Sequence, residues 1–238
     1  MNYPRRFFDL NLLFAHKVAE VSGQSFDSAL LHYTNLYIRF GLGWDLSAAN
    51  PVWQEYLSGL NAVADRGEWT YHFYLNRQPA VPAVLQLPFG CFSYDVVDGG
   101  RIRLHFHNTE PAGCSPLSKD CMSHRLAELK NMFAHVKQAV SIPTTVIGAS
   151  WLYNLEAYRR LFPPAYLATS QVGEDDFAYL PLWGQFINHR GQINEERVEQ
   201  FLLRLDRQHD CVGLAGCFPF QVLHLESSIE DFYSFYGV

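Results

Sequence analysis

Residues 101–162 constrain the fold of this chain more than any other stretch, because two secondary-structure periods follow one another there in a fixed order. Residues 101–108 alternate strictly: Ile102, Leu104 and Phe106 fall on one side, and Arg or His side chains fall on the other. A period of two over eight residues predicts a strand with one buried face. Beyond a turn of small residues, apolar side chains recur every three or four residues, which predicts an amphipathic helix.

We expect this helix to follow directly on the strand. Pro116 suits the first helical position and Ser115 suits the N-cap. Pro143 marks its end, and the apolar run 144–152 then predicts a strand covered on both faces. A helix start beside a strand end gathers unpaired N–H groups, so the turn is either an anion site or a capped connection that binds nothing.

The rest of the chain predicts a helical beginning and a sheet behind it. Residues 5–43, broken near 22–25, and residues 51–67 behind the Asn50 cap carry helical apolar stripes, so we expect a helical N-terminal segment or cap over residues 1–67. Asp98-Gly99-Gly100 predicts a tight hairpin. The other expected elements are strands over residues 69–75, 84–97, 179–188 and 218–225, a helix capped by Asn194 and a last helix after Ser227-Ser228.

This order predicts an α+β fold. Helices, a meander of three strands and then alternating helices and strands favour a mixed, mostly antiparallel sheet flanked by helices. We expect this sheet domain to occupy residues 68–238.

Charge and cysteine content limit the partners and the compartment. A net charge of −6 without a Lys/Arg cluster argues against a nucleic-acid partner. No run of about 20 apolar residues occurs and the N-terminus makes a poor secretory signal, so we expect no membrane segment. Five cysteines without a CxxC spacing fit reduced thiols, which predicts a cytoplasmic protein.

The order of elements is similar to that of the GNAT acyltransferase fold. Residues 154–162, Asn-Leu-Glu-Ala-Tyr-Arg-Arg-Leu-Phe, also resemble the family segment Asn-x-x-Ala followed by Tyr-x-x-Leu-Gly-Phe, shortened by about a turn. The resemblance covers roughly residues 69–188 and extends to acyltransferase-like proteins whose GNAT-type half follows a helical N-terminal region.

The resemblance implies an N-acyltransferase that uses acyl-coenzyme A and an amine acceptor. In the family, the loop between the fourth strand and the next helix cradles the cosubstrate's pyrophosphate, and residues 108–115 would take that place. The amine would attack the thioester, His105 or His107 would accept its proton, and Tyr158 would protonate the leaving thiolate. The residues implied to bind the cosubstrate are Gly113, Cys114, Ser115, Leu117 and Asn154.

The same residues allow other chemistry. His105 and His107, two apart on one strand face, have the spacing of metal ligands and would suit a metal-dependent hydrolase. Arg101 and Arg103 on that face oppose a cation, and we expect no metal. Cys114 beside a helix start could act as a nucleophile with a histidine, or it could simply be a packed small residue.

A non-catalytic binding or assembly module is the alternative of a different class. The family's loop pattern, Gln/Arg-x-x-Gly-x-Gly/Ala, is missing here, and aromatic residues make up 15% of the chain. In this alternative Tyr158 and Trp151 are core residues. A homodimer through an edge strand near residues 218–225 is one assembly that the sequence allows.

The most specific structural expectation concerns the predicted strands over residues 101–108 and 144–152. In a GNAT-like fold they run parallel, pair near Leu104 and Val146, and then separate, with a bulge or Trp151 as the wedge. A ladder along their full length, together with Glu110 at the helix start, would argue against acyl transfer.

Overall fold

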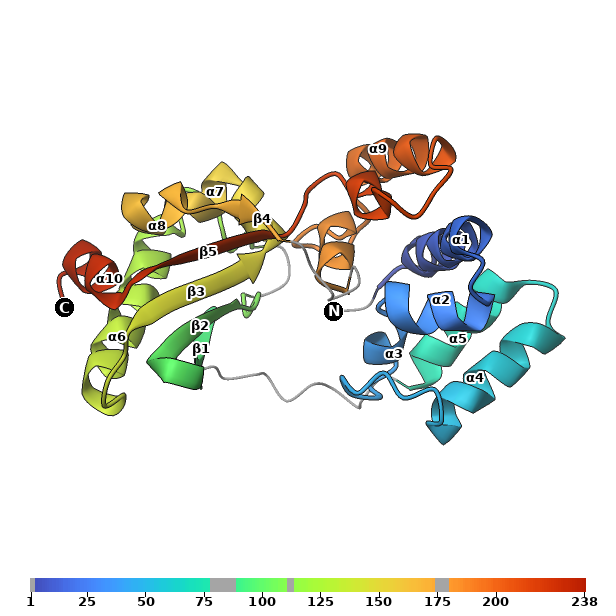
Figure 1. The fold of residues 1–238 in the computed structure, drawn as a ribbon, viewed down its shortest axis with the longest axis horizontal. Coiled ribbons are helices and arrows are strands. Elements are labelled where there is room, and N and C mark those ends of the chain that lie inside the picture. Colours follow the sequence, from blue (N-terminus) through green and yellow to red (C-terminus); the bar gives the residue numbers. More distant parts are fainter. Residues whose placement is uncertain (1–2, 78–88, 111–113, 174–179) are drawn as a thin grey trace. The chain divides into compact units, whose positions relative to one another are not determined.

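The computed structural model describes residues 3–77, 89–110, 114–173 and 180–238, which form an α+β protein with a five-stranded mixed sheet (Figure 1). The chain divides into two compact units. We call Met1–Pro82 with Asp175–Pro219 the helical unit, and Ala83–Glu174 with Phe220–Val238 the sheet unit. This division differs from the expected boundary after residue 67, because a later segment joins the N-terminal helices.

The helical unit contains most of the helices that the sequence predicted. Ser25 and Asn50 cap two of them by accepting backbone N–H groups, and Asn194 caps a third. The predicted starts at Asn50 and Asn194 are confirmed, as is the break between residues 22 and 26. The helices are α1 (Arg5–Ser22), α2 (Phe26–Tyr33), α3 (Leu36–Arg39), α4 (Pro51–Ala62), α5 (Arg66–Asn76) and α9 (Glu195–Asp206).

The predicted strand over residues 69–75 is wrong, because this segment lies inside α5. Asp65 starts the helix by accepting the N–H of Glu68 at 2.9 Å. Phe73 and Tyr74 are buried against the neighbouring helices. The alternation of aromatic side chains favours a strand locally, but tertiary packing of a helical face decides the outcome.

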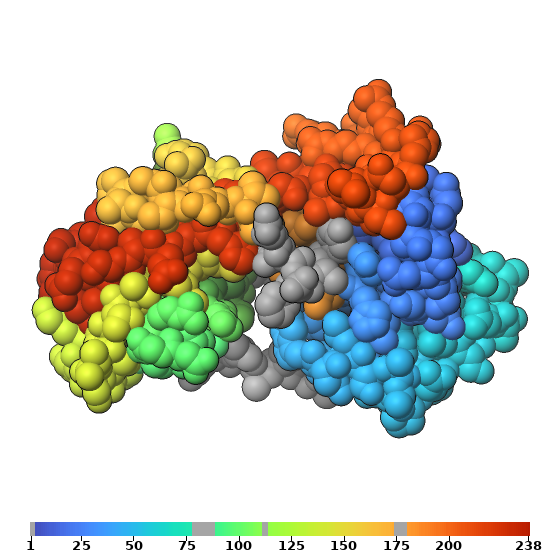
Figure 2. Space-filling model, in the orientation of Figure 1, coloured from blue at the N-terminus to red at the C-terminus, as the bar shows by residue number. Residues whose placement is uncertain are grey.

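The predicted strand over residues 179–188 is also wrong, because Leu180–Phe186 forms a 3₁₀ helix, η3. Trp183 is fully buried, and its ring centroid lies 5.7 Å from that of Phe14 in α1 and 6.2 Å from that of Phe201 in α9. These aromatic contacts hold η3 and α9 on the N-terminal helices. In the space-filling view, the segment that contains α9 lies directly against the N-terminal helices of the helical unit (Figure 2). They are the physical reason for the division of the chain.

The sheet has the strand order β1-β2-β3-β5-β4, and every neighbouring pair is antiparallel except β2 and β3. The hairpin at Asp98–Gly100 is confirmed. β5 lies between β3 and β4, so the expected free edge near residues 218–225 is wrong; β1 and β4 are the edges of the described sheet. The strands are β1 (Phe92–Val97), β2 (Arg101–Phe106), β3 (Thr145–Ser150), β4 (Gln171–Val172) and β5 (Leu223–Ser228).

One face of the sheet carries the core and the other is largely exposed. Ile102 and Val146 are buried, whereas Arg103 and Ala149 on the opposite face are exposed. Strand β3 is therefore covered on one face only, and the expectation that both of its faces are covered is wrong. The first part of the predicted strand 84–97 lies outside the described residues.

Helices α6 (Met122–Ala139) and α10 (Ile229–Tyr236) cover the core face together. The ring centroid of Phe133 in α6 lies 4.8 Å from that of Phe232 in α10. The predicted last helix is confirmed, with Ser228 as its cap, one residue later than the capping-box spacing of Ser227 and Glu230 indicated. Two short helices, α7 (Glu156–Arg159) and α8 (Pro164–Ala168), follow β3 and a 3₁₀ turn, η2 (Trp151–Asn154).

The predicted start of α6 at Pro116 is wrong, because the helix begins at Met122. The chain from residue 115 to 121 forms turns instead. The N–H of Ser118 bonds to the carbonyl of Ser115 at 3.1 Å, and the hydroxyl of Ser118 accepts the N–H of Cys121 at 3.4 Å. None of the helices in the described ranges is long and apolar enough to cross a bilayer.

Candidate functional site

The parallel strands β2 and β3 are paired over a short stretch only. Ile102 lies opposite Val146 and Arg103 lies opposite Ile147, and the ladder contains no further pair although both strands continue for three more residues. The predicted separation is therefore present. The predicted pairing of Leu104 with Val146 is wrong, because the register is shifted by two residues.

A group of tyrosine rings fills the core side of the sheet where the strands separate. The ring of Tyr158 lies 5.5 Å from Phe106 of β2 and 5.0 Å from Tyr153. The hydroxyls of Tyr153 and Tyr166 are 2.9 Å apart. Both hydroxyls lie against Gly148 of β3, where a Cβ atom would overlap them. We call Tyr153, Tyr158 and Tyr166 the tyrosine wedge, because these rings reach from β2 to β3.

Trp151, the expected wedge, lies elsewhere. Its ring is parallel to that of Phe220 within 4° at a centroid distance of 6.1 Å. The amide nitrogen of Asn154, at the end of the same turn, donates to the carbonyls of Trp151 and Gln221 at 2.8 Å each. Asn154 therefore holds η2 to the segment that leads into β5.

Tyr158, the predicted acid, is buried within the tyrosine wedge and is 2% exposed. Burial raises its pKa well above the usual range, and Tyr153, which shares a hydrogen bond with its hydroxyl, raises it further. Tyr158 is therefore protonated at neutral pH, which is the state that an acid requires.

The two predicted bases lie on the opposite face at the same end of β2. The Nε2 atom of His105 is 2.8 Å from a carboxylate oxygen of Asp95 in β1, and the imidazole donates to it. The ring centroid of His107 lies 6.4 Å from that of His105. Partial burial lowers the pKa of His107, and the neighbouring His105 lowers it further, so His107 is neutral near pH 7.

Asp95 is a site residue that the sequence reasoning missed. The hairpin register pairs Asp95 with Arg103 and Ser93 with His105, which places the carboxylate diagonally across from the imidazole. The predicted Asp98-Gly99-Gly100 turn fixes the register of the hairpin, and this register could have identified Asp95 as a neighbour of His105. Among the residues described, no group of three or more His, Cys, Asp or Glu side chains is arranged to hold a metal, so the hydrolase hypothesis gains no third ligand.

The predicted cosubstrate loop precedes α6 by several residues. Gly113 lies outside the described residues, Cys114 is exposed, and Ser115 and Leu117 are half-buried. The carbonyl of Leu117 accepts from the guanidinium of Arg160 at 2.7 Å, which ties the loop to the segment after α7.

A buried charged cluster lies in the first turns of α6. Arg125 is 1% exposed, and its Nη2 atom is 2.5 Å from a carboxylate oxygen of Glu110 and 3.0 Å from one of Glu128. Its Nη1 atom contacts the sulfur of Cys91. Glu128 also accepts the N–H of Cys91 at 3.2 Å, and burial raises the pKa of Glu128. Sequence reasoning missed this cluster. The signal for it was Arg125 itself, a charged residue four positions before Leu129 and so on the buried face of the helix.

The unpaired atom of this cluster is Nε of Arg125, which is buried without a hydrogen-bond partner in the described part of the chain. The ion pair with Arg125 places Glu110 at the first turn of α6. A carboxylate at this helix start is one of the two conditions that would argue against acyl transfer. The other condition, a ladder along the full length of β2 and β3, is not met.

These groups meet around one end of β2. His105, His107 and Asp95 lie on the exposed face and Tyr158 lies on the core face, while Glu110 follows the strand in sequence. No protein-family model, curated protein or solved structure matches this chain.

Proposed function

We propose that the sheet unit binds an acyl-coenzyme A and transfers its acyl group to an amine, as the GNAT resemblance implies. The observation that carries this proposal is the ladder between β2 and β3, which ends after Arg103 and Ile147. Backbone groups of separated strands need other partners, and the amides of a pantetheine arm would supply them. The strand order, with α6 following β2, supports the same arrangement.

A thioester held between the strands would have a base on one side of the sheet and an acid on the other. The amine nitrogen attacks the thioester carbonyl, and a carbon–nitrogen bond forms as the carbon–sulfur bond breaks. His107 accepts the amine proton because its lowered pKa keeps it neutral. His105, oriented by Asp95, is the second base within reach of the same position.

Tyr158 is the proton donor to the leaving thiolate in this mechanism. Its raised pKa keeps the hydroxyl protonated, and its contact with Phe106 puts the ring beside the end of β2. Replacement by phenylalanine would remove the proton and preserve the ring packing. We place the reaction in the cytoplasm because all five cysteines are free thiols.

The direct test is calorimetry of the whole chain with acetyl-coenzyme A, octanoyl-coenzyme A and free coenzyme A. Binding of any of them supports the proposal, and no binding at millimolar ligand refutes it. For the chemical step, His107→Ala should lower turnover while the cosubstrate still binds, because only His105 then remains as a base. His209→Ala is the matched control, because His209 is an exposed histidine in the helical unit.

A non-catalytic binding or assembly module on the same sheet is the second candidate. The observation that favours it is the Glu110 carboxylate on Arg125, since a negative charge there opposes an incoming phosphate at the start of α6. If coenzyme A binds in competition with Glu110, Glu110→Gln should raise its affinity severalfold. A protein that binds no coenzyme A with or without this substitution, and that light scattering shows to be a dimer, would favour the module.

A further inference from the structure

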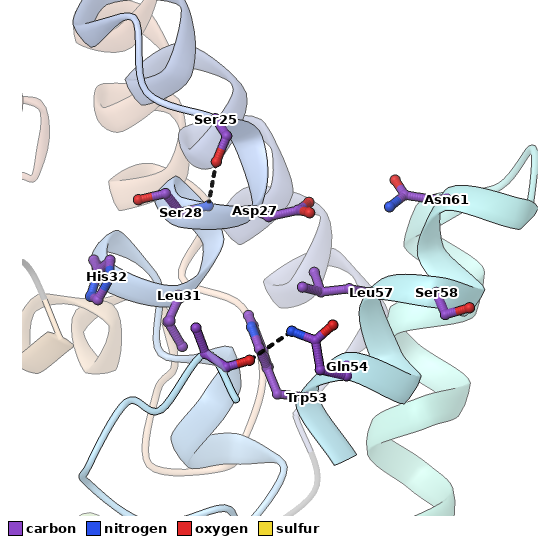
Figure 3. Close-up of a pocket in the computed structure, with 11 residues that line it drawn as sticks. Ser25, Asp27, Ser28, Leu31, His32, Trp53, Gln54, Leu57, Ser58 and Asn61 are labelled. Carbon is purple, nitrogen blue, oxygen red and sulfur yellow. Dashed lines mark hydrogen bonds between the residues drawn. The ribbon is translucent and has the colours of Figure 1, made fainter. Parts of the chain in front are cut away.

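A cleft of about 430 Å³ lies in the helical unit between α2 and α4 (Figure 3). This volume falls within the range of small-molecule sites. Its floor is apolar, formed by Leu31, Trp53 and Leu57, which are between 1% and 8% exposed. Its walls carry hydroxyl, amide and carboxyl groups and the imidazole of His32. An apolar floor with a few polar groups around it is the usual composition of a ligand site.

The polar walls favour a positively charged ligand. Asp27 is the one carboxylate among the residues that line the cleft, and none of those residues is Lys or Arg. Asp27 of α2 and Asn61 of α4 point toward one another across the cleft (Figure 3). The amide nitrogen of Gln54 already donates to the carbonyl of Ala48 at 2.6 Å, so its oxygen is left as a further acceptor.

Asp27 lies in the first turn of α2 but is not the cap of this helix. Ser25 caps α2 by accepting the N–H of Ser28 at 3.2 Å. Asp27 has no hydrogen bond or ion pair within the described ranges, and the residue is half-buried beside the apolar floor. A partly desolvated carboxylate without a partner attracts a cation more strongly than one in open solvent.

We propose that this cleft binds a small primary amine, with the ammonium group between Asp27 and Asn61 and an alkyl chain over Leu57. Charge-assisted hydrogen bonds to the carboxylate and the amide oxygen would hold the ammonium group. The apolar floor would take the chain. This binding site is separate from the proposed acyl transfer, which involves residues of the sheet unit.

The test uses n-butylamine, n-butanol and butyrate as probes of equal chain length and different charge. Each is titrated into the ¹⁵N-labelled full chain, and backbone amide shifts are followed by NMR. We expect butylamine to shift the amides of Ser28, Leu57 and Asn61, butanol to bind at least ten-fold more weakly, and butyrate not to bind. Equal binding of butylamine and butanol, or shifts confined to other residues, would overturn the proposal.

Two substitutions change the site in opposite directions. Asp27→Asn should weaken butylamine binding about ten-fold, because it removes the charge and keeps the shape. Asn61→Asp should strengthen it about three-fold, and this gain does not depend on how the first variant folds. Glu199→Gln, an exposed carboxylate on α9, is the matched control and should change nothing. Unchanged affinity in a folded Asp27→Asn protein, or an equal loss in the control, would refute the assignment.

Discussion

Gly148 is the position where the packing of the tyrosine wedge can be tested most directly. A Cβ atom on this residue of β3 would overlap the hydroxyls of Tyr153 and Tyr166 at once. Both rings are buried and held by neighbouring aromatic rings, so neither hydroxyl can move away freely. We therefore expect Gly148→Ala to destabilise the sheet unit strongly.

Two contributions determine the magnitude. An extra methyl group forced into a well-packed core costs about 1–3 kcal/mol. Separation of the Tyr153 and Tyr166 hydroxyls, now 2.9 Å apart, loses a buried hydrogen bond worth about 1 kcal/mol. The expected loss is about 2–4 kcal/mol, a large part of the total stability of a typical domain.

The assay is urea unfolding of the full chain, followed by near-ultraviolet circular dichroism, which reports on the packed tyrosines. Because the chain has two units, two transitions are possible, and the one that shifts identifies the sheet unit. Gly216→Ala is the matched control: a Cβ atom there meets nothing within 4 Å, so we expect a change below about 0.5 kcal/mol.

A double-mutant cycle separates the clash from other effects. Tyr166→Phe alone should cost about 1 kcal/mol by removing one hydroxyl. In the Gly148→Ala background the same change should cost less or restore stability, because it removes one of the two clashing atoms. The reasoning fails if Gly148→Ala is as neutral as Gly216→Ala, or if the two effects add without coupling.

Three further predictions concern His107, just beyond the end of β2, and Arg125 in the first turn of α6. For acyl transfer, kcat/KM should fall as the pH decreases, with a midpoint below pH 6.5, because the lowered pKa of His107 keeps its imidazole neutral until more acid pH. The His107→Gln protein should not show this fall, and an unchanged pH profile would exclude His107 as the base. Protonation of His107 also opposes folding, so the stability that it contributes is full above pH 6.5 and is lost as the pH falls through its folded pKa. Arg125→Met should cost about 3–5 kcal/mol in urea unfolding, because it leaves the carboxylates of Glu110 and Glu128 without their buried partner, and a loss below about 1 kcal/mol would show that the cluster does not stabilise the fold.

Features that depend on neighbours in the sequence could be predicted. Asn50, Asn194 and Ser228 each cap the helix that follows, because a cap needs only a side-chain acceptor two or three residues before an N–H donor. The Asp98–Gly100 hairpin and the buried face of β2 follow from turn chemistry and a period of two. The separation of β2 from β3 was predicted from a family resemblance, but the register predicted with it was wrong by two residues.

Where local preference and packing compete, prediction from the sequence failed. The aromatic residues of α5 alternate like a strand, yet contacts with α1 and α4 bury Phe73 and Tyr74 on one face of a helix. Ser115 and Pro116 have the residue types of a helix start, yet the turns before Cys121 delay α6 by six residues. For α5 the deciding contacts come from helices remote in the sequence, whereas between residues 115 and 121 hydrogen bonds three residues apart form turns in place of a helix.

The contacts that define the candidate site join residues that are remote in the sequence, so only the tertiary structure reveals them. Asp95 meets His105 across a hairpin, and Arg125 gathers Glu110 and Cys91 from segments 15 and 34 residues away. The amino-acid sequence specifies residue types and local periodicities, which suffice to predict helix caps, hairpins and the buried faces of strands. Distances between remote side chains arise only when the elements pack, since burial of apolar surface brings them together whatever their separation along the chain.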